Sequence, residues 1–246
     1  MQESVAQFAI RLICGIGLAL CAMPRKDVAT AFFRIMLLVI LGLAVLFTLM
    51  AHAGAVWRGA AIGAVAFAGS VCWLLERRQA GTLAIGAICL LATIEVVVFQ
   101  QGQGEAGTAR HWLDAASALA TSATLGAAVT GMLLGHRYLT APGMPLAPLI
   151  WMNAGLGLAA VLRFSVSALA LWSGYEALTQ STYWIWLALR WLAGILGPMA
   201  ACVMVQQILR YRNTQAATGV LFVAVILTFI GELTADLLYR TLHVPF

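Results

Sequence analysis

Residues 31–52, AFFRIMLLVILGLAVLFTLMAH, form an apolar run that contains a single charged side chain, Arg34. A helix of about 20 such residues is long enough to cross the hydrocarbon core of a bilayer. Similar runs recur along the whole chain. They predict an all-α integral membrane fold, a single transmembrane helical domain over residues 1–246 with about eight spanning helices near 5–23, 31–52, 56–76, 82–100, 113–135, 148–172, 184–209 and 216–239.

The composition excludes an ordinary soluble domain. Of the 246 residues, 63% are hydrophobic and 9% are charged, whereas soluble domains carry roughly 25% charged residues. Eight helices use about 160 positions, so little chain is left for loops and none for a soluble catalytic domain. The net charge of +5 comes from short loop segments rather than from a long basic run, which argues against a nucleic-acid partner and for a lipid bilayer.

The distribution of loop charges predicts the orientation. Loops one, three, five and seven carry seven basic residues, whereas the other side carries three, and cytoplasmic loops are enriched in Lys and Arg. Both termini are therefore expected on the outer (periplasmic) side of a bacterial-type cytoplasmic membrane. The chain begins Met1-Gln2-Glu3, without the basic region of a signal peptide, so the first apolar run is expected to be a retained helix. The seven basic residues are Arg25, Lys26, Arg77, Arg78, Arg137, Arg210 and Arg212.

Several ionisable side chains fall inside the predicted helices, mostly in their outer halves. Such groups cost several kcal/mol in a bilayer and usually mark a functional site or a buried ion pair. Two interpretations stay open: the charges pair with one another and fix the order of the helices, or they line a polar pocket that opens to the outer leaflet. The candidate residues are Arg11, His52, Glu95, Arg163, Arg190, Glu232 and Asp236.

A second candidate site lies at the cytoplasmic end of the fifth predicted helix, where His136 and Tyr138 stand. These residues fit a helix terminus at the membrane interface. Alternatively, they form a contact surface for lipid headgroups, a quinone or a partner protein.

The histidines and cysteines do not favour a metal centre. His52 and His136 are at opposite ends of their helices, about 30 Å apart across the bilayer, so they cannot share one haem. The five cysteines are scattered through apolar runs and form no CxxC motif. We therefore expect no metal site and no covalently bound cofactor, and a haem is disfavoured.

The last predicted helix contains Gly231-Glu232-Leu233, followed by Leu238-Tyr239-Arg240. Together with eight helices, external termini and polar residues in the outer leaflet, this pattern resembles the membrane anchor subunits of respiratory oxidoreductases, the NrfD, DmsC and PsrC types. The resemblance implies a quinone site near the outer face and an iron–sulfur partner subunit docked outside. In that case a carboxylate or His52 would move the quinol proton, and an arginine would hold a quinone oxygen.

The expected function is therefore that of a membrane subunit in a multi-subunit electron-transfer complex. It would anchor partner subunits, one of them on the outer face, and would at most supply the quinone site, since the sequence shows no self-contained active site. The alternatives are a transporter of ions or small solutes that uses the buried Arg and Glu residues, and a purely structural or assembly subunit.

Overall fold

The computed structural model describes residues 2–101, 108–141, 143–178 and 180–242. Every regular element in these ranges is helical. The elements are α1 (Gln2–Ala22), α2 (Thr30–Met50), α3 (Ala53–Leu74), α4 (Arg78–Gln101), α5 (Thr108–Thr140), α6 (Ala147–Gly174), the short 3₁₀ helix η1 (Tyr175–Ala177), α7 (Ser181–Trp191), the π-helical η2 (Leu192–Leu196), α8 (Gly197–Arg210) and α9 (Thr214–Leu242).

The described residues contain eight helical segments that are long and apolar enough to cross a membrane, which confirms the predicted number. The seventh segment, Ser181–Arg210, consists of α7, η2 and α8 in succession. The largest difference in boundaries is at the fifth helix, predicted over 113–135 and observed as Thr108–Thr140. Polar residues at its two ends continue the helix beyond the apolar run. The fold is compatible with an integral membrane protein.

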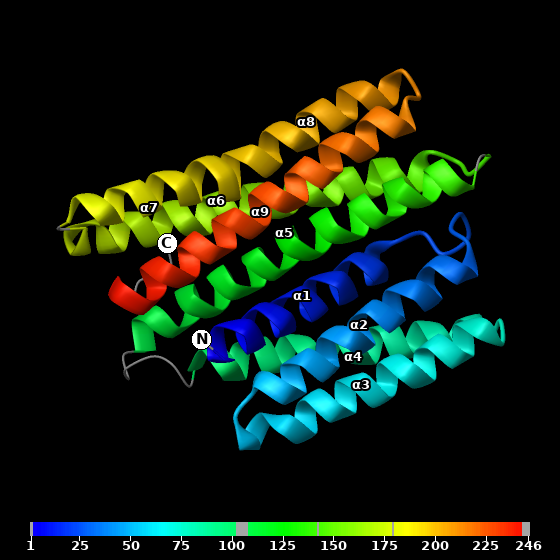
Figure 1. Cartoon of the computed structure of the whole chain (residues 1–246), viewed down its shortest axis with the longest axis horizontal. Helices are drawn as coiled ribbons and strands as arrows, with labels where there is room; N and C mark the ends of the chain where they lie inside the picture. The colour runs from blue at the N-terminus through cyan, green and yellow to red at the C-terminus, as the bar shows by residue number, and fades with distance from the viewer. Residues whose placement is uncertain (1, 102–107, 142, 179, 243–246) are drawn as a thin grey trace.

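The first and last helices end on the same side of the molecule (Figure 1), and this side is called the terminal end below. Antiparallel helices in even number require this arrangement. The loops that carry Arg25, Arg77 and Arg212 lie at the opposite end.

The spanning segments form two antiparallel groups of four. In the first group, α1 packs on α2, α2 on α3, α3 on α4 and α4 on α1. In the second group, α5 packs on α6, α6 on α8, α8 on α9 and α9 on α5, and α7 also packs on α9. The two groups meet where α5 packs on α1 and α4, so α5 connects the halves of the molecule.

Two glycines allow α1 and α5 to touch backbone to backbone. A Cβ atom on Gly15 would overlap the carbonyl group of Ser122 and would lie 2.8 Å from the backbone nitrogen of Gly126. A Cβ atom on Gly126 would overlap the backbone of Gly15. Small residues at such positions let membrane helices approach closely and pack well. This backbone contact is part of the junction between the two groups.

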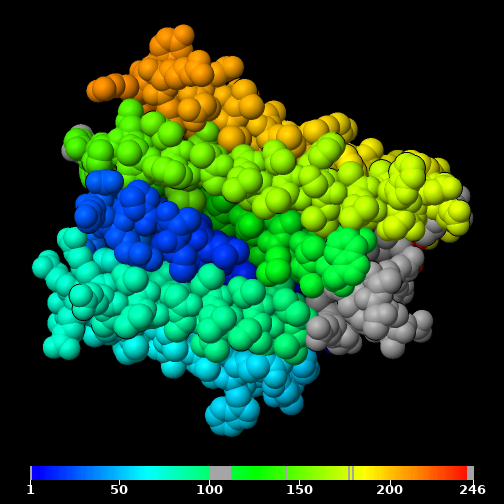
Figure 2. Space-filling view, turned by 180° about the vertical axis from the view of Figure 1, so that it is seen from behind, coloured from blue at the N-terminus to red at the C-terminus, as the bar shows by residue number. Residues whose placement is uncertain are grey.

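Two grooves flank this junction on opposite faces. One lies between α1 and α9. The other, of about 360 Å³, lies between α1 and α6, where Figure 2 shows α5 between them. Leu18, Met152 and Leu158 line the second groove, and none of its lining residues is charged.

Candidate functional site

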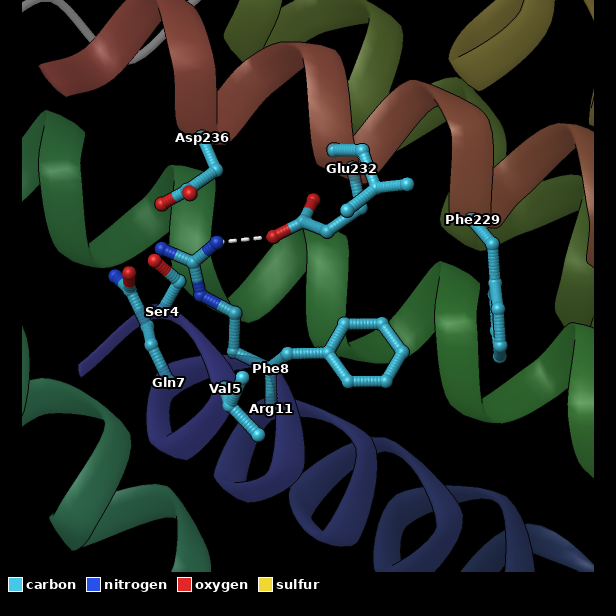
Figure 3. Close-up of a pocket in the computed structure, with 9 residues that line it drawn as sticks. Ser4, Val5, Gln7, Phe8, Arg11, Phe229, Glu232 and Asp236 are labelled. Carbon is cyan, nitrogen blue, oxygen red and sulfur yellow. Dashed lines mark hydrogen bonds and ion pairs between the residues drawn. The ribbon is translucent and has the colours of Figure 1, made fainter. Parts of the chain in front are cut away.

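The groove between α1 and α9 is the candidate site, because it combines apolar walls with buried charges. Both helices pack on α5, and the space between them has a volume of about 300 Å³. Phe8 of α1 and Phe229 of α9 meet edge to face, with ring centroids 5.1 Å apart. Figure 3 shows these rings at one end of the groove and the charged side chains at the other.

An ion pair between Arg11 of α1 and Glu232 of α9 crosses the groove (Figure 3). The side chains are 13% and 6% exposed, so the ion pair is largely buried. The second carboxylate oxygen of Glu232, Oε2, accepts no hydrogen bond from the described residues. One turn further along α9, Asp236 faces the same groove and binds Arg240, with 2.9 Å between Oδ2 and Nε.

Arg190, at the end of α7, lies beside Gly231, the residue that precedes Glu232 on α9. Its side chain is buried, and its Nε and Nη2 atoms form no hydrogen bond with the described residues. A Cβ atom on Gly194 would lie 2.8 Å from Nη1 of Arg190 and 2.7 Å from Cα of Gly231, so the guanidinium group occupies the crossing of η2 and α9.

Arg163 lies elsewhere, between α5 and α6. Its Nη1 atom donates a hydrogen bond to the carbonyl oxygen of Ser117, at 3.1 Å, and another to the Ser117 hydroxyl group. The side chain is buried. These hydrogen bonds join α6 to α5, so Arg163 contributes to the packing of the second group of helices.

Glu95 and His52 belong to the first group of helices. Glu95 of α4 is 1% exposed and forms an ion pair with Arg58 of α3, whose Nη2 atom is 3.1 Å from Oε1. The His52 ring lies 6.0 Å from the ring of Phe99. This cluster joins α3 to α4 and is separate from the α1–α9 groove.

The predicted polar residues therefore divide among three places. Arg11, Glu232 and Asp236 line one groove, and Arg190 lies next to it. Glu95 and Arg163 instead pair with groups that the sequence interpretation did not include, Arg58 and Ser117. Position along a helix predicts the depth of a side chain, but it does not predict which neighbouring helix that side chain faces. The sequence does contain a signal for Arg58 as a partner of a buried acid. It is a charged residue in the second turn of α3, close to the short turn that joins α2 to α3.

The two residues proposed for the opposite end have different environments. The Tyr138 side chain is buried, and its hydroxyl group donates a hydrogen bond to the carbonyl oxygen of Pro145. This contact fastens the loop after α5. His136 is exposed at the same end of the helix.

Replacing Arg58 by Ala tests the second cluster. The change leaves the Glu95 carboxylate buried without its cation, so we expect the free energy of unfolding to fall by about 1–3 kcal/mol. The unfolding of the purified protein in mild detergent measures this. Arg34→Ala is the matched control, because Arg34 is exposed on α2 and should change stability by less than about 0.5 kcal/mol. Equal losses in the two variants would contradict the assigned role of the Arg58–Glu95 pair.

The described residues contain no group of three or more His, Cys, Asp or Glu side chains that could hold a metal ion. Comparison with protein-family models, curated proteins and solved structures found no match to this chain. The resemblance to the anchor subunits of respiratory oxidoreductases therefore stays a prediction.

Proposed function

We propose that this protein is an integral membrane subunit of a multi-subunit electron-transfer complex, and that a quinone binds in the α1–α9 groove. The observation that carries the proposal is the Arg11–Glu232 ion pair in a groove of about 300 Å³ whose walls include the apolar side chains of Phe8, Phe229 and Leu233. Ligand sites for small molecules are mostly apolar, with a few polar groups that orient the ligand.

The chemistry of the groove suits a quinone headgroup. The aromatic rings of Phe8 and Phe229 offer flat apolar walls. A guanidinium group such as that of Arg11 can donate to a quinone oxygen, and a carboxylate such as Glu232 or Asp236 can accept the proton of a quinol hydroxyl group. The exposed side chain of Leu233 lies at the edge of the groove, where an isoprenoid tail would leave it for the lipid.

The loop charges support the orientation in this proposal. Basic residues gather in the loops opposite the terminal end, and cytoplasmic loops carry such an excess. The terminal end then faces the outside of a bacterial-type cytoplasmic membrane, and the groove lies in the outer leaflet. A partner subunit that carries redox centres would dock on this face, because the chain places few residues outside its helices.

Filling the groove tests the proposal. Leu233→Trp puts a large side chain at its edge, so quinol-dependent electron transfer by the native complex should fall about tenfold or more, equivalent to about 1.4 kcal/mol. Leu237→Trp is the matched control, because Leu237 is also exposed on α9 but does not line the groove. The complex is purified from the native membrane in mild detergent. A protein that purifies without redox subunits and without quinone would contradict the proposed function.

One observation favours transport as a second candidate function. The seventh spanning segment changes to a π-helix over Leu192–Leu196, midway along its length, and π-helical turns often lie at functional sites. Arg190 is adjacent to this change. Uptake of solutes into vesicles that contain only the purified protein would support transport over electron transfer.

A further inference from the structure

Two thiol groups meet where α1 packs on α4. The thiol of Cys21, in the last turn of α1, forms a hydrogen bond with the thiol of Cys89, in the middle of α4. Both side chains are half-buried. Thiols are weak donors and weak acceptors, so this hydrogen bond contributes little to the stability of the fold. Two thiols in contact can, however, be joined by a covalent bond.

The close approach of the two helices brings these sulfur atoms together. A Cβ atom on Gly17 would lie 3.2 Å from Cα of Cys89 and 3.4 Å from its Cβ atom, so the backbones of α1 and α4 are close at this level. Cys21 follows Gly17 by one helical turn and is on the same face of α1. A disulfide needs such proximity, because its two Cα atoms are about 4.4–6.8 Å apart.

The directions of the side chains also favour this pair. The Cα–Cβ bonds of a helix tilt toward its N-terminus, and α1 and α4 run in opposite directions. The side chains of Cys21 and Cys89 therefore lean toward each other. Cys14, on the other side of Gly17, leans away from Cys89, and its sulfur atom lies 3.5 Å from the hydroxyl oxygen of Thr93. Cys21 rather than Cys14 is therefore the partner of Cys89.

We propose that Cys21 and Cys89 form a redox-active dithiol, which a quinone dissolved in the bilayer oxidises to a disulfide between α1 and α4. Two S–H bonds break and one S–S bond forms. The two electrons and the two protons pass to the quinone, which becomes a quinol. A dithiol reductant reverses the reaction by thiol–disulfide exchange and is itself oxidised to a disulfide.

The surroundings of the two thiols favour an oxidant that dissolves in lipid. Both cysteines are in segments apolar enough to cross a membrane, and each has an exposed neighbour, Ala22 beside Cys21 and Leu90 beside Cys89. Figure 2 shows α1 and α4 side by side on one face of the molecule. A charged, water-soluble oxidant such as oxidised glutathione is excluded from hydrocarbon. This inference goes beyond the proposed function and does not rest on it, because neither cysteine lines the α1–α9 groove.

The test uses the full-length protein in lipid nanodiscs, first reduced and then freed of reductant. Duroquinone is the oxidant, because its fully substituted ring cannot alkylate thiols. The protein is then unfolded in a maleimide, and peptide mass spectrometry measures which cysteines were protected. We expect a disulfide-linked peptide pair that contains Cys21 and Cys89, with Cys14, Cys72 and Cys202 alkylated. Oxidised glutathione at the same concentration should form this disulfide at least about tenfold more slowly, because access to the thiols limits its reaction.

Variants identify the two sulfur atoms. Cys21→Ser and Cys89→Ser should each abolish the linked peptide pair. Cys72→Ser is the matched control, because Cys72 is half-buried on α3, and Cys14→Ser tests the nearest alternative partner. Both should form the disulfide at the wild-type rate. The peptide map of the wild type needs no variant, so it decides the result even where a substitution prevents folding.

Three results would overturn the proposal. The first is the absence of the linked peptide pair after treatment with duroquinone. The second is a disulfide that joins Cys14 to Cys89, or that joins two copies of the protein. The third is an equal rate with duroquinone and with oxidised glutathione, which would show that the thiols are oxidised from water rather than from lipid.

The α1–α9 groove provides a separate check. Leu233→Trp, which fills this groove, should leave the formation of the disulfide by duroquinone unchanged, because the thiols meet the quinone from the lipid. Loss of the disulfide in this variant would overturn that route. A complex that has quinol-dependent activity but forms no disulfide would overturn this inference alone, whereas a disulfide without such activity would overturn only the proposed function.

Discussion

Replacing Glu232 by Ala is expected to lower the free energy of unfolding by about 3–5 kcal/mol, because it removes the carboxylate of the buried ion pair with Arg11 and the anion next to the Arg190 guanidinium group. Glu232 is 4% exposed, and Arg190 is 2% exposed, so water can compensate little of this loss. Unfolding of the purified protein in mild detergent measures the change. Asp236→Ala is the control one turn away, where the partly exposed ion pair with Arg240 is worth about 0.2–1 kcal/mol.

The reciprocal change should be much milder. Arg11→Gln leaves Glu232 beside Arg190, and these two charges can pair with each other. We therefore expect Arg11→Gln to lower the free energy of unfolding by less than half of the loss in Glu232→Ala. Equal losses would show that Glu232 and Arg190 do not form a pair when Arg11 is removed. This comparison needs no knowledge of the ligand.

Replacing Gly126 by Ala is expected to cause the second large effect. The added methyl group would overlap the backbone of Gly15, so α1 and α5 must move apart along the junction of the two helix groups. Overpacking of this kind costs about 1–3 kcal/mol. The apparent melting temperature should fall by roughly 2–4 °C for each kcal/mol lost.

Gly42→Ala and Gly86→Ala are the matched controls. Both positions are in the interior of helices, and a Cβ atom there would meet nothing within 4 Å. Because Ala has a higher helix propensity than Gly, by up to about 1 kcal/mol, these variants should be neutral or slightly more stable. A Gly126→Ala protein as stable as the controls would contradict the close contact of α1 with α5.

The helices could be predicted from the sequence because a bilayer imposes one simple requirement, a run of apolar residues of sufficient length. The seventh segment contains a π-helix over Leu192–Leu196, which its apolar sequence does not predict. A π-helical turn depends on tertiary contacts, here the approach of η2 to Gly231, and these have no local sequence signal.

The candidate site was harder to predict than the fold. Depth along the helices brought Arg11, Glu232 and Asp236 to one level, and the structure places all three on one groove. The same reasoning added Glu95 and Arg163, which face other helices. What the sequence does not provide is the rotation of each helix about its own axis, which decides the neighbouring helix that a given side chain faces. Long apolar stretches do not reveal this direction, because lipid and protein interior favour the same side chains.

The central position of α5 has a consequence for biosynthesis. A chain made from its N-terminus inserts α1 to α4 before α5 has been synthesised. The face of α1 that carries Gly15 then meets lipid during translation, with a bare backbone surface and no partner. The closest backbone contact between the two helix groups can therefore form only after α5 has been synthesised.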